Sequence, residues 1–202
     1  MNKPLLILKE NYLNPLSTIL CGIMGLSPRE IYQNVQNGNV DKSSAVELLV
    51  SLSENSRSLN TRLKSISMLE KVGARTEPVF KLLENLFISD GNERVRNIAA
   101  KALKSLFLDK ALTPMKWAIE HEPSLNCLIT AISILGEINT NESKRVLIEE
   151  LRQIGKEKLD KYLKHEQESL NELSGPQLSQ ILINHALISS LKLKFGYINF
   201  EL

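Results

Sequence analysis

The chain has 202 residues, of which 43% are hydrophobic and 24% are charged, a balance that excludes general disorder and is typical of a folded domain. Its formal net charge is only +2, which excludes binding to nucleic acid through bulk charge. Cys21 and Cys127 lie too far apart in sequence to suggest a cysteine metal clamp or a disulfide framework. We therefore expect a reduced, cytoplasmic setting.

Residues 1–26 form an apolar segment that is interrupted by polar residues such as Lys9 and Glu10. A membrane span needs about 20 mostly apolar residues, and a signal peptide needs one unbroken apolar region. The segment meets neither requirement, so we expect an apolar N-terminal cap and no membrane span. An open alternative is a homodimer that forms through its most apolar residues, Ile19, Leu20, Ile23 and Met24.

Residues 27–54 are predicted to form a degenerate helical hairpin. Ser27, Pro28 and Glu30 make a capping box with proline in the first helical position, which fixes the start of a helix. Gly38 is suited to end that helix in the left-handed conformation, and Asp41 is suited to cap the next one.

Residues 58–155 contain the most regular pattern. Apolar residues at helical spacing precede Gly73, which closes a first helix, and Pro78 opens a second helix that ends near Asp90. The pattern then recurs: Arg62 aligns with Arg96 after 34 residues, and a third copy follows after a further 31. Repetition at 20 to 50 residues is typical of a solenoid, because one helix pair cannot cover its own apolar faces.

Asn92, the Val95–Arg96 pair and the small residues before Leu103 resemble the first helix of a HEAT repeat. In the third copy, Ile134 and Gly136 resemble the end of such a helix and its turn. The resemblance implies an all-α fold: a right-handed α-solenoid of stacked HEAT-like hairpins with a C-terminal capping helix. It also implies that the arginines bond to caps and carbonyls of neighbouring hairpins. The expected structural residues are Arg62, Leu69, Asn92, Val95, Arg96, Leu103, Ile134 and Gly136.

Residues 156–195 are predicted to form a long charged helix followed by a helix that caps the stack, with Gly155 as a point where the first could bend. Residues 196–202 alternate apolar and polar side chains as a strand does, so they could begin a further domain.

The family resemblance implies a non-catalytic scaffold that binds another protein or a peptide segment on the face of consecutive second helices. We expect no catalytic residue, metal or cofactor. The candidate partner-binding residues are Lys81, Glu84, Asn85, Lys116, Trp117, Glu120, Lys144, Glu149 and Arg152.

Two other functions stay open as less favoured alternatives. A local basic patch could bind nucleic acid; it comprises Arg94, Arg96, Lys101, Lys104, Lys110 and Lys116. The His121–Glu122 and His165–Glu166 pairs resemble half of the iron-binding set of deoxyhypusine hydroxylase, a HEAT-repeat metalloenzyme that uses four such motifs.

Overall fold

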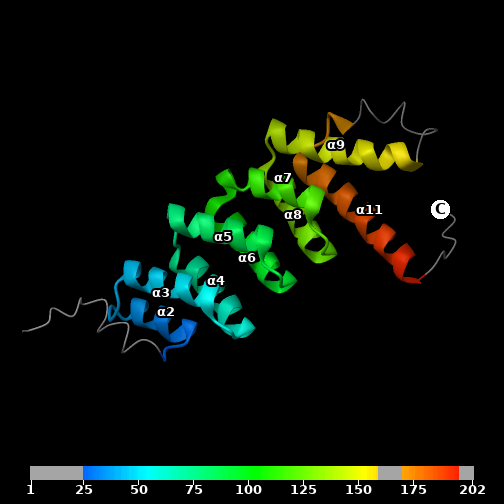
Figure 1. Ribbon diagram of the computed structural model, residues 1–202. Helices are drawn as coiled ribbons and strands as arrows, with labels where there is room; N and C mark the ends of the chain where they lie inside the picture. Colours follow the sequence, from blue (N-terminus) through cyan, green and yellow to red (C-terminus); the bar gives the residue numbers. More distant parts are fainter. Residues whose placement is uncertain (1–24, 159–169, 196–202) are drawn as a thin grey trace, which may run out of the picture.

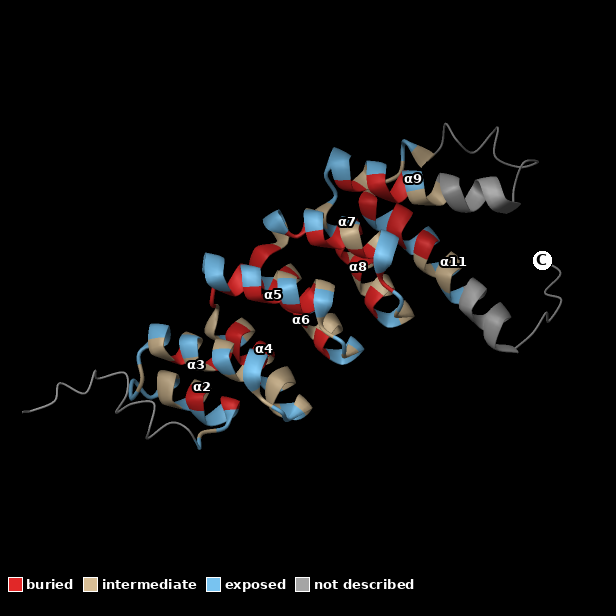
Figure 2. Ribbon diagram, viewed as in Figure 1, coloured by how far each residue is buried: buried red, intermediate tan, exposed pale blue. Residues whose placement is uncertain are grey.

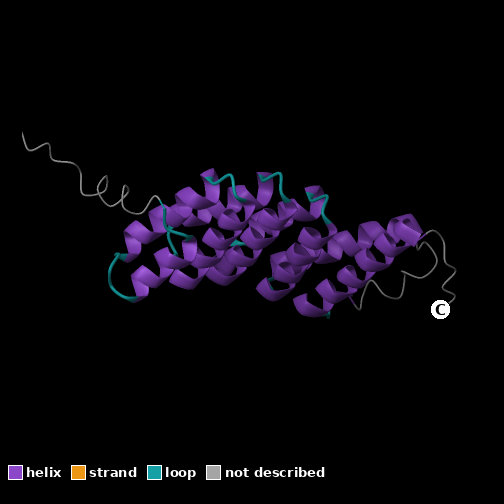
Figure 3. Cartoon of the chain, turned by 90° about the horizontal axis from the view of Figure 1, so that it is seen from below, coloured by secondary structure: helices purple, strands orange, loops and turns teal. Residues whose placement is uncertain are grey.

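The computed structural model describes residues 25–158 and 170–195, and every regular element in these two ranges is a helix (Figure 3). The all-α prediction is therefore confirmed for this part of the chain. The helices are α2 (Pro28–Gln36), α3 (Lys42–Asn55), α4 (Leu59–Val72), α5 (Glu77–Ser89), α6 (Glu93–Phe107), α7 (Leu112–His121), α8 (Leu125–Ile138), α9 (Asn141–Lys158) and α11 (Gly175–Phe195).

Short polar caps set the helix boundaries where the sequence predicts them. Ser27 and Glu30 form the expected capping box, in which the Ser27 amide donates to the Glu30 carboxylate at 2.7 Å. Asp41 accepts a hydrogen bond of 2.9 Å from the Ser44 amide at the start of α3. Gly73 ends α4 with a φ of 66°, a conformation that glycine adopts without steric cost.

The helices form two rows that run side by side (Figure 1). The first row consists of α2, α4, α6, α8 and α11, each in contact with the next. The second row consists of α3, α5, α7 and α9, in which α5 contacts α7 and α7 contacts α9. Apolar residues from both rows join one continuous buried cluster that extends from Ile31 to Leu182 (Figure 2).

Between the rows, the backbones approach most closely in the pairs α3/α4 and α5/α6. The sequence pattern instead pairs α4 with α5, which a short turn connects. Ser53, Ser65 and Ala99 are small, fully buried residues on α3, α4 and α6, and small side chains allow helix axes to come close together. In both of these pairs the two helices follow one another along the chain, so the closest pairs are offset by one helix from the α4–α5 hairpin that the sequence pattern predicts.

Gly136 lies inside α8, and the expectation that it marks a turn is wrong. The left-handed turn residue is Asn139, whose φ is 50°. Gly136 instead lets α11 come close: a β-carbon at this position would lie 2.4 Å from Ser179 Oγ and 2.9 Å from the Gly175 carbonyl oxygen. The Gly175 amide also donates a hydrogen bond of 2.7 Å to Asn139 Oδ1. The start of α11 is thus fitted directly against the end of α8.

Some expectations concern other parts of the chain. The helix α9 continues through Gly155 to Lys158, so this glycine does not break it. Residues 1–24, which include the candidate dimer residues Ile19, Leu20, Ile23 and Met24, lie outside the described residues, as does the strand-like tail 196–202. Among the helices that are described, none combines the length and the apolar character needed to cross a membrane.

Substitution of Gly136 by alanine should destabilise the protein. In an open helix the change would stabilise by about 1 kcal/mol, but the new methyl group would overlap Ser179 and Gly175, and overpacking typically costs about 1–3 kcal/mol. We expect a lower midpoint in urea unfolding and faster hydrogen exchange in α11. Gly91→Ala is the control, because no atom lies within 4 Å of a β-carbon there. Equal stability of the two variants would contradict the close packing of α8 and α11.

Candidate functional site

Arg62 connects three elements of the fold. It is the fourth residue of α4, and its Nε donates a hydrogen bond of 2.8 Å to the carbonyl oxygen of Ser53 near the end of α3. Its guanidinium group also forms an ion pair with the carboxylate of Asp90, the residue that ends α5. Arg62 therefore fixes α4 against both of its second-row neighbours.

Arg96 repeats this arrangement one unit further along the chain. It is the fourth residue of α6, and Nε and one terminal nitrogen bond the two carboxylate oxygens of Glu122 at 2.9 and 2.8 Å. Its remaining terminal nitrogen donates to the carbonyl oxygen of Asp90 at 2.9 Å. The side chains of Arg96 and Glu122 are only 12% and 1% exposed, and the Glu122 hydrogen bonds raise the pKa of Arg96.

The two carboxylates also cap the helices that follow them. Asp90 accepts a hydrogen bond of 2.9 Å from the amide of Asn92, and Glu122 accepts one of 2.8 Å from the amide of Ser124. Asn92 and Ser124 are the N-cap residues of α6 and α8. We call the pairs Arg62–Asp90 and Arg96–Glu122 the polar joints, since each connects a first-row helix to the end of a second-row helix and the start of the next unit.

The third copy of the pattern has Cys127 in place of an arginine. Cys127 is buried, its thiol donates to the carbonyl oxygen of Glu93 at 3.3 Å, and burial raises its pKa. Between the same two helices, Asn97 Nδ2 donates to the Asn126 carbonyl oxygen at 3.1 Å and to Thr130 Oγ1 at 3.2 Å. Neutral hydrogen bonds therefore stand where an arginine would join α6 to α8, and the Lys104–Glu137 ion pair also connects these two helices.

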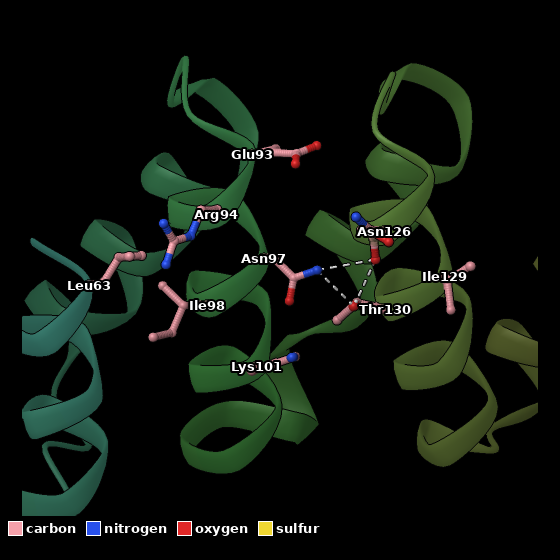
Figure 4. Close-up of a pocket in the computed structure, with 9 residues that line it drawn as sticks. All are labelled: Leu63, Glu93, Arg94, Asn97, Ile98, Lys101, Asn126, Ile129 and Thr130. Atoms are coloured by element: carbon pink, nitrogen blue, oxygen red, sulfur yellow. Dashed lines mark hydrogen bonds between the residues drawn. The ribbon is translucent and has the colours of Figure 1, made fainter. Parts of the chain in front are cut away.

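An open groove of about 600 Å³ crosses the first row over α4, α6 and α8 (Figure 4). Arg94, Leu63 and Ile98 lie between α4 and α6, whereas Asn97 reaches across to α8. Leu63, Ile98 and Ile129 are half-buried. The groove is lined by Leu63, Glu93, Arg94, Asn97, Ile98, Lys101, Asn126, Ile129 and Thr130.

The structure divides the basic patch of the middle repeat. Arg96 belongs to a polar joint, Lys104 pairs with Glu137 at 2.6 Å, and Lys110 pairs with Glu77 at 2.8 Å. Arg94 and Lys101 lie in the groove, but Lys116 is on α7 in the other row. The six residues consequently do not make one cationic surface.

None of the nine candidate partner-binding residues lines the groove. All of them are on second-row helices, where Lys81 pairs with Glu84 at 2.8 Å and the Trp117 ring stacks on His121 with 4.7 Å between ring centroids. Asn85, Lys116, Glu120 and Glu149 are exposed, and Lys144 is half-buried. Arg152 lies in the part of α9 for which the structure describes no side chains.

The His121–Glu122 pair is occupied by other contacts. Both carboxylate oxygens of Glu122 bind Arg96, while His121 stacks on Trp117 and its Nδ1 lies 2.9 Å from the Trp117 carbonyl oxygen. The second pair, His165–Glu166, lies outside the described residues. Within the described part of the chain, no group of three or more His, Cys, Asp or Glu residues is placed to hold a metal ion.

The remaining structural residues have the positions expected of a core or a cap. Leu69, Val95, Leu103 and Ile134 are at most 1% exposed, and the Asn92 side chain accepts a hydrogen bond of 3.0 Å from the Arg94 amide.

The sequence singles out only Arg94 and Lys101 among the groove residues. The sequence signal of the other groove residues is weak, because half-buried leucine and isoleucine on a helix look like core residues until the neighbouring helix is placed.

Comparison of the sequence with known proteins finds no matching family model and no matching curated protein.

Removal of the Glu122 carboxylate should strongly destabilise the fold. Glu122→Ala leaves the guanidinium of Arg96 buried without its partner, and loss of one member of a buried ion pair typically costs about 3 kcal/mol or more. We expect a large shift of the urea unfolding midpoint. Glu77→Ala breaks the exposed pair with Lys110 and should change stability little. Equal shifts for both variants would contradict the importance of the joint.

Glu150, on α9, should make stability depend on pH. Burial raises the pKa of its carboxyl group, and the charge of Glu120 raises it further. The folded state thus favours the protonated carboxyl group of Glu150. Its contribution to stability is complete at pH values below the pKa that the group has in the unfolded chain, and it is lost as the pH rises through the higher pKa of the folded state.

We therefore expect Glu150→Gln to be more stable than the wild type at neutral pH, with the difference shrinking as the pH falls below the ordinary carboxyl range. Urea unfolding at several pH values measures this. Glu149→Gln, at an exposed neighbouring position, is the control. If the stability difference between Glu150→Gln and the wild type instead grew as the pH fell, the raised pKa of Glu150 would be contradicted.

Proposed function

We propose that this chain is a non-catalytic scaffold, a right-handed solenoid of HEAT-like hairpins that binds a segment of another protein. The proposed binding surface is the groove over α4, α6 and α8. The observation that carries the proposal is that one groove crosses three successive helices of a single row and combines apolar, amide and charged side chains. Such a mixed lining suits the apolar side chains and backbone of a polypeptide.

The repeated joints support the HEAT-like part of the proposal. In both α4 and α6 an arginine in the fourth helical position contacts a carboxylate at the end of the next second-row helix. Both carboxylates then cap the following first-row helix. A unit that repeats its polar contacts as well as its apolar positions is what a helical repeat requires.

The joints also support a binding role, because they hold the groove in one shape. Arg96 connects α6 to Asp90 and Glu122, and Asn97 connects α6 to α8. A surface that is rigid before binding loses little conformational entropy when a partner arrives.

The distribution of charge favours a protein partner over nucleic acid. Three of the six cations in the candidate basic patch are already paired with acids, and those that remain are divided between the two rows. Affinity for nucleic acid depends on many phosphates being neutralised together.

Affinity capture with matched variants tests this function. The wild type should capture a partner that the groove variant Ile98→Ser/Ile129→Ser loses, because two of the three apolar side chains that line the groove are removed. A second-row variant, Lys116→Ala/Glu120→Ala, should retain it. Loss of capture with the second-row variant alone would move the binding surface to α7, and capture unaffected by either variant would exclude the groove.

A further inference from the structure

We infer that the groove over α4, α6 and α8 binds an extended acidic peptide segment that carries apolar side chains. This inference rests on the proposed function and adds the chemical class of the partner.

Two cations of the groove have no partner among the residues that the structure describes. Arg94 and Lys101 are exposed, and neither side chain forms an ion pair or hydrogen bond within the described residues. Seven residues separate them on α6, which places them about 10 Å apart along the helix axis, on either side of Ile98. A segment that crosses the helices over Ile98 would therefore pass between two positive charges.

Arg94 is poorly placed for the stability of its own helix. It is the second residue of α6, where the helix dipole favours an acid and disfavours a cation. The neighbouring Glu93 has the favourable sign there, and its carboxylate accepts a hydrogen bond of 2.8 Å from Ser124 Oγ. The acid in the groove is thus engaged with α8, whereas the cation points between α4 and α6 (Figure 4).

The floor of the groove favours an extended chain with apolar residues. Leu63, Ile98 and Ile129 come from three successive helices of the row, one from each. Packed helix axes lie about 8–10 Å apart, and an extended chain in the polyproline II conformation advances about 3.1 Å per residue with three residues per turn, so every third side chain faces the same side. An apolar side chain at about every third residue would therefore meet the three floor residues in turn, with acidic residues between them facing the cations.

The same lining disfavours a nucleic acid as the occupant. No aromatic side chain is among the residues that line the groove, so bases would have no stacking platform there. Two unpaired cations would neutralise few phosphates. An acidic peptide needs only a few such contacts, together with the apolar floor.

The test is selection from a library of random dodecapeptides displayed on phage, with the folded wild-type chain as bait and the variant Arg94→Glu/Lys101→Glu as the counter-selection. The matched control is Lys116→Glu/Lys144→Glu, which makes the same change of net charge on the second row. Enriched peptides, and a single-stranded oligonucleotide, are then labelled with fluorescein and titrated by fluorescence anisotropy.

We expect the enriched peptides to combine Asp or Glu with Leu, Ile or Val, and to bind more weakly as salt increases. The variant Arg94→Glu/Lys101→Glu should bind them at least about tenfold more weakly, and the control variant Lys116→Glu/Lys144→Glu should match the wild type. Because Glu at position 94 suits the helix dipole, the single variant Arg94→Glu should unfold no more easily than the wild type while binding less tightly.

The contrary outcomes separate the two proposals. Enrichment of neutral or basic peptides that still need Ile98 and Ile129 would overturn the acidic partner and leave the scaffold intact. Binding of the oligonucleotide without peptide enrichment, or the absence of any enriched peptide that depends on Arg94 and Lys101 or on Ile98 and Ile129, would overturn both.

Discussion

The fold depends on guanidinium groups that are buried where two rows of helices meet. Each of Arg62 and Arg96 satisfies a carboxylate at the end of one helix and a backbone carbonyl at the end of another. The ends of helices leave backbone groups without partners, and at a packed interface these groups are costly to bury. The arginines meet that need at two successive interfaces, and Asp90 takes part in both. Burial of the apolar core stabilises the stacking of the helices, whereas the arginine contacts fix the position of each helix pair relative to the next.

The groove is a consequence of the same contacts. Helix α6 supplies most of its lining, and the start of α6 is held by the Asn92 cap, by Arg96 and by the bond from Asn97 to α8. With the helix fixed in this way, Arg94 and Lys101 have no partner in the described part of the chain, and Ile98 is only half-buried. The exposed cations Arg94 and Lys101 thus lie on one face of α6, on either side of Ile98, which packs against the core.

Local signals in the sequence predict most of the helix boundaries, because a capping box such as that of Ser27 and Glu30 acts within one turn. The buried positions of Leu69 and Leu103 also follow from helical periodicity. The close approach of α11 that Gly136 allows, and the position of the groove, could not be predicted in this way. Both depend on which helix lies opposite, and the periodicity within one helix does not specify its neighbour. The family resemblance places the candidate partner residues on the second row, whereas the groove lies on the first.

The two rows have a consequence for how the chain folds. The main contacts among the described helices join elements that are close together along the chain, for example α4 with α3 and α6. Contact order is therefore low, and little loop-closure entropy must be lost before packing begins. Folding can start at any well-capped pair and spread in both directions, and a defect at one interface leaves the helices on either side with neighbours of their own.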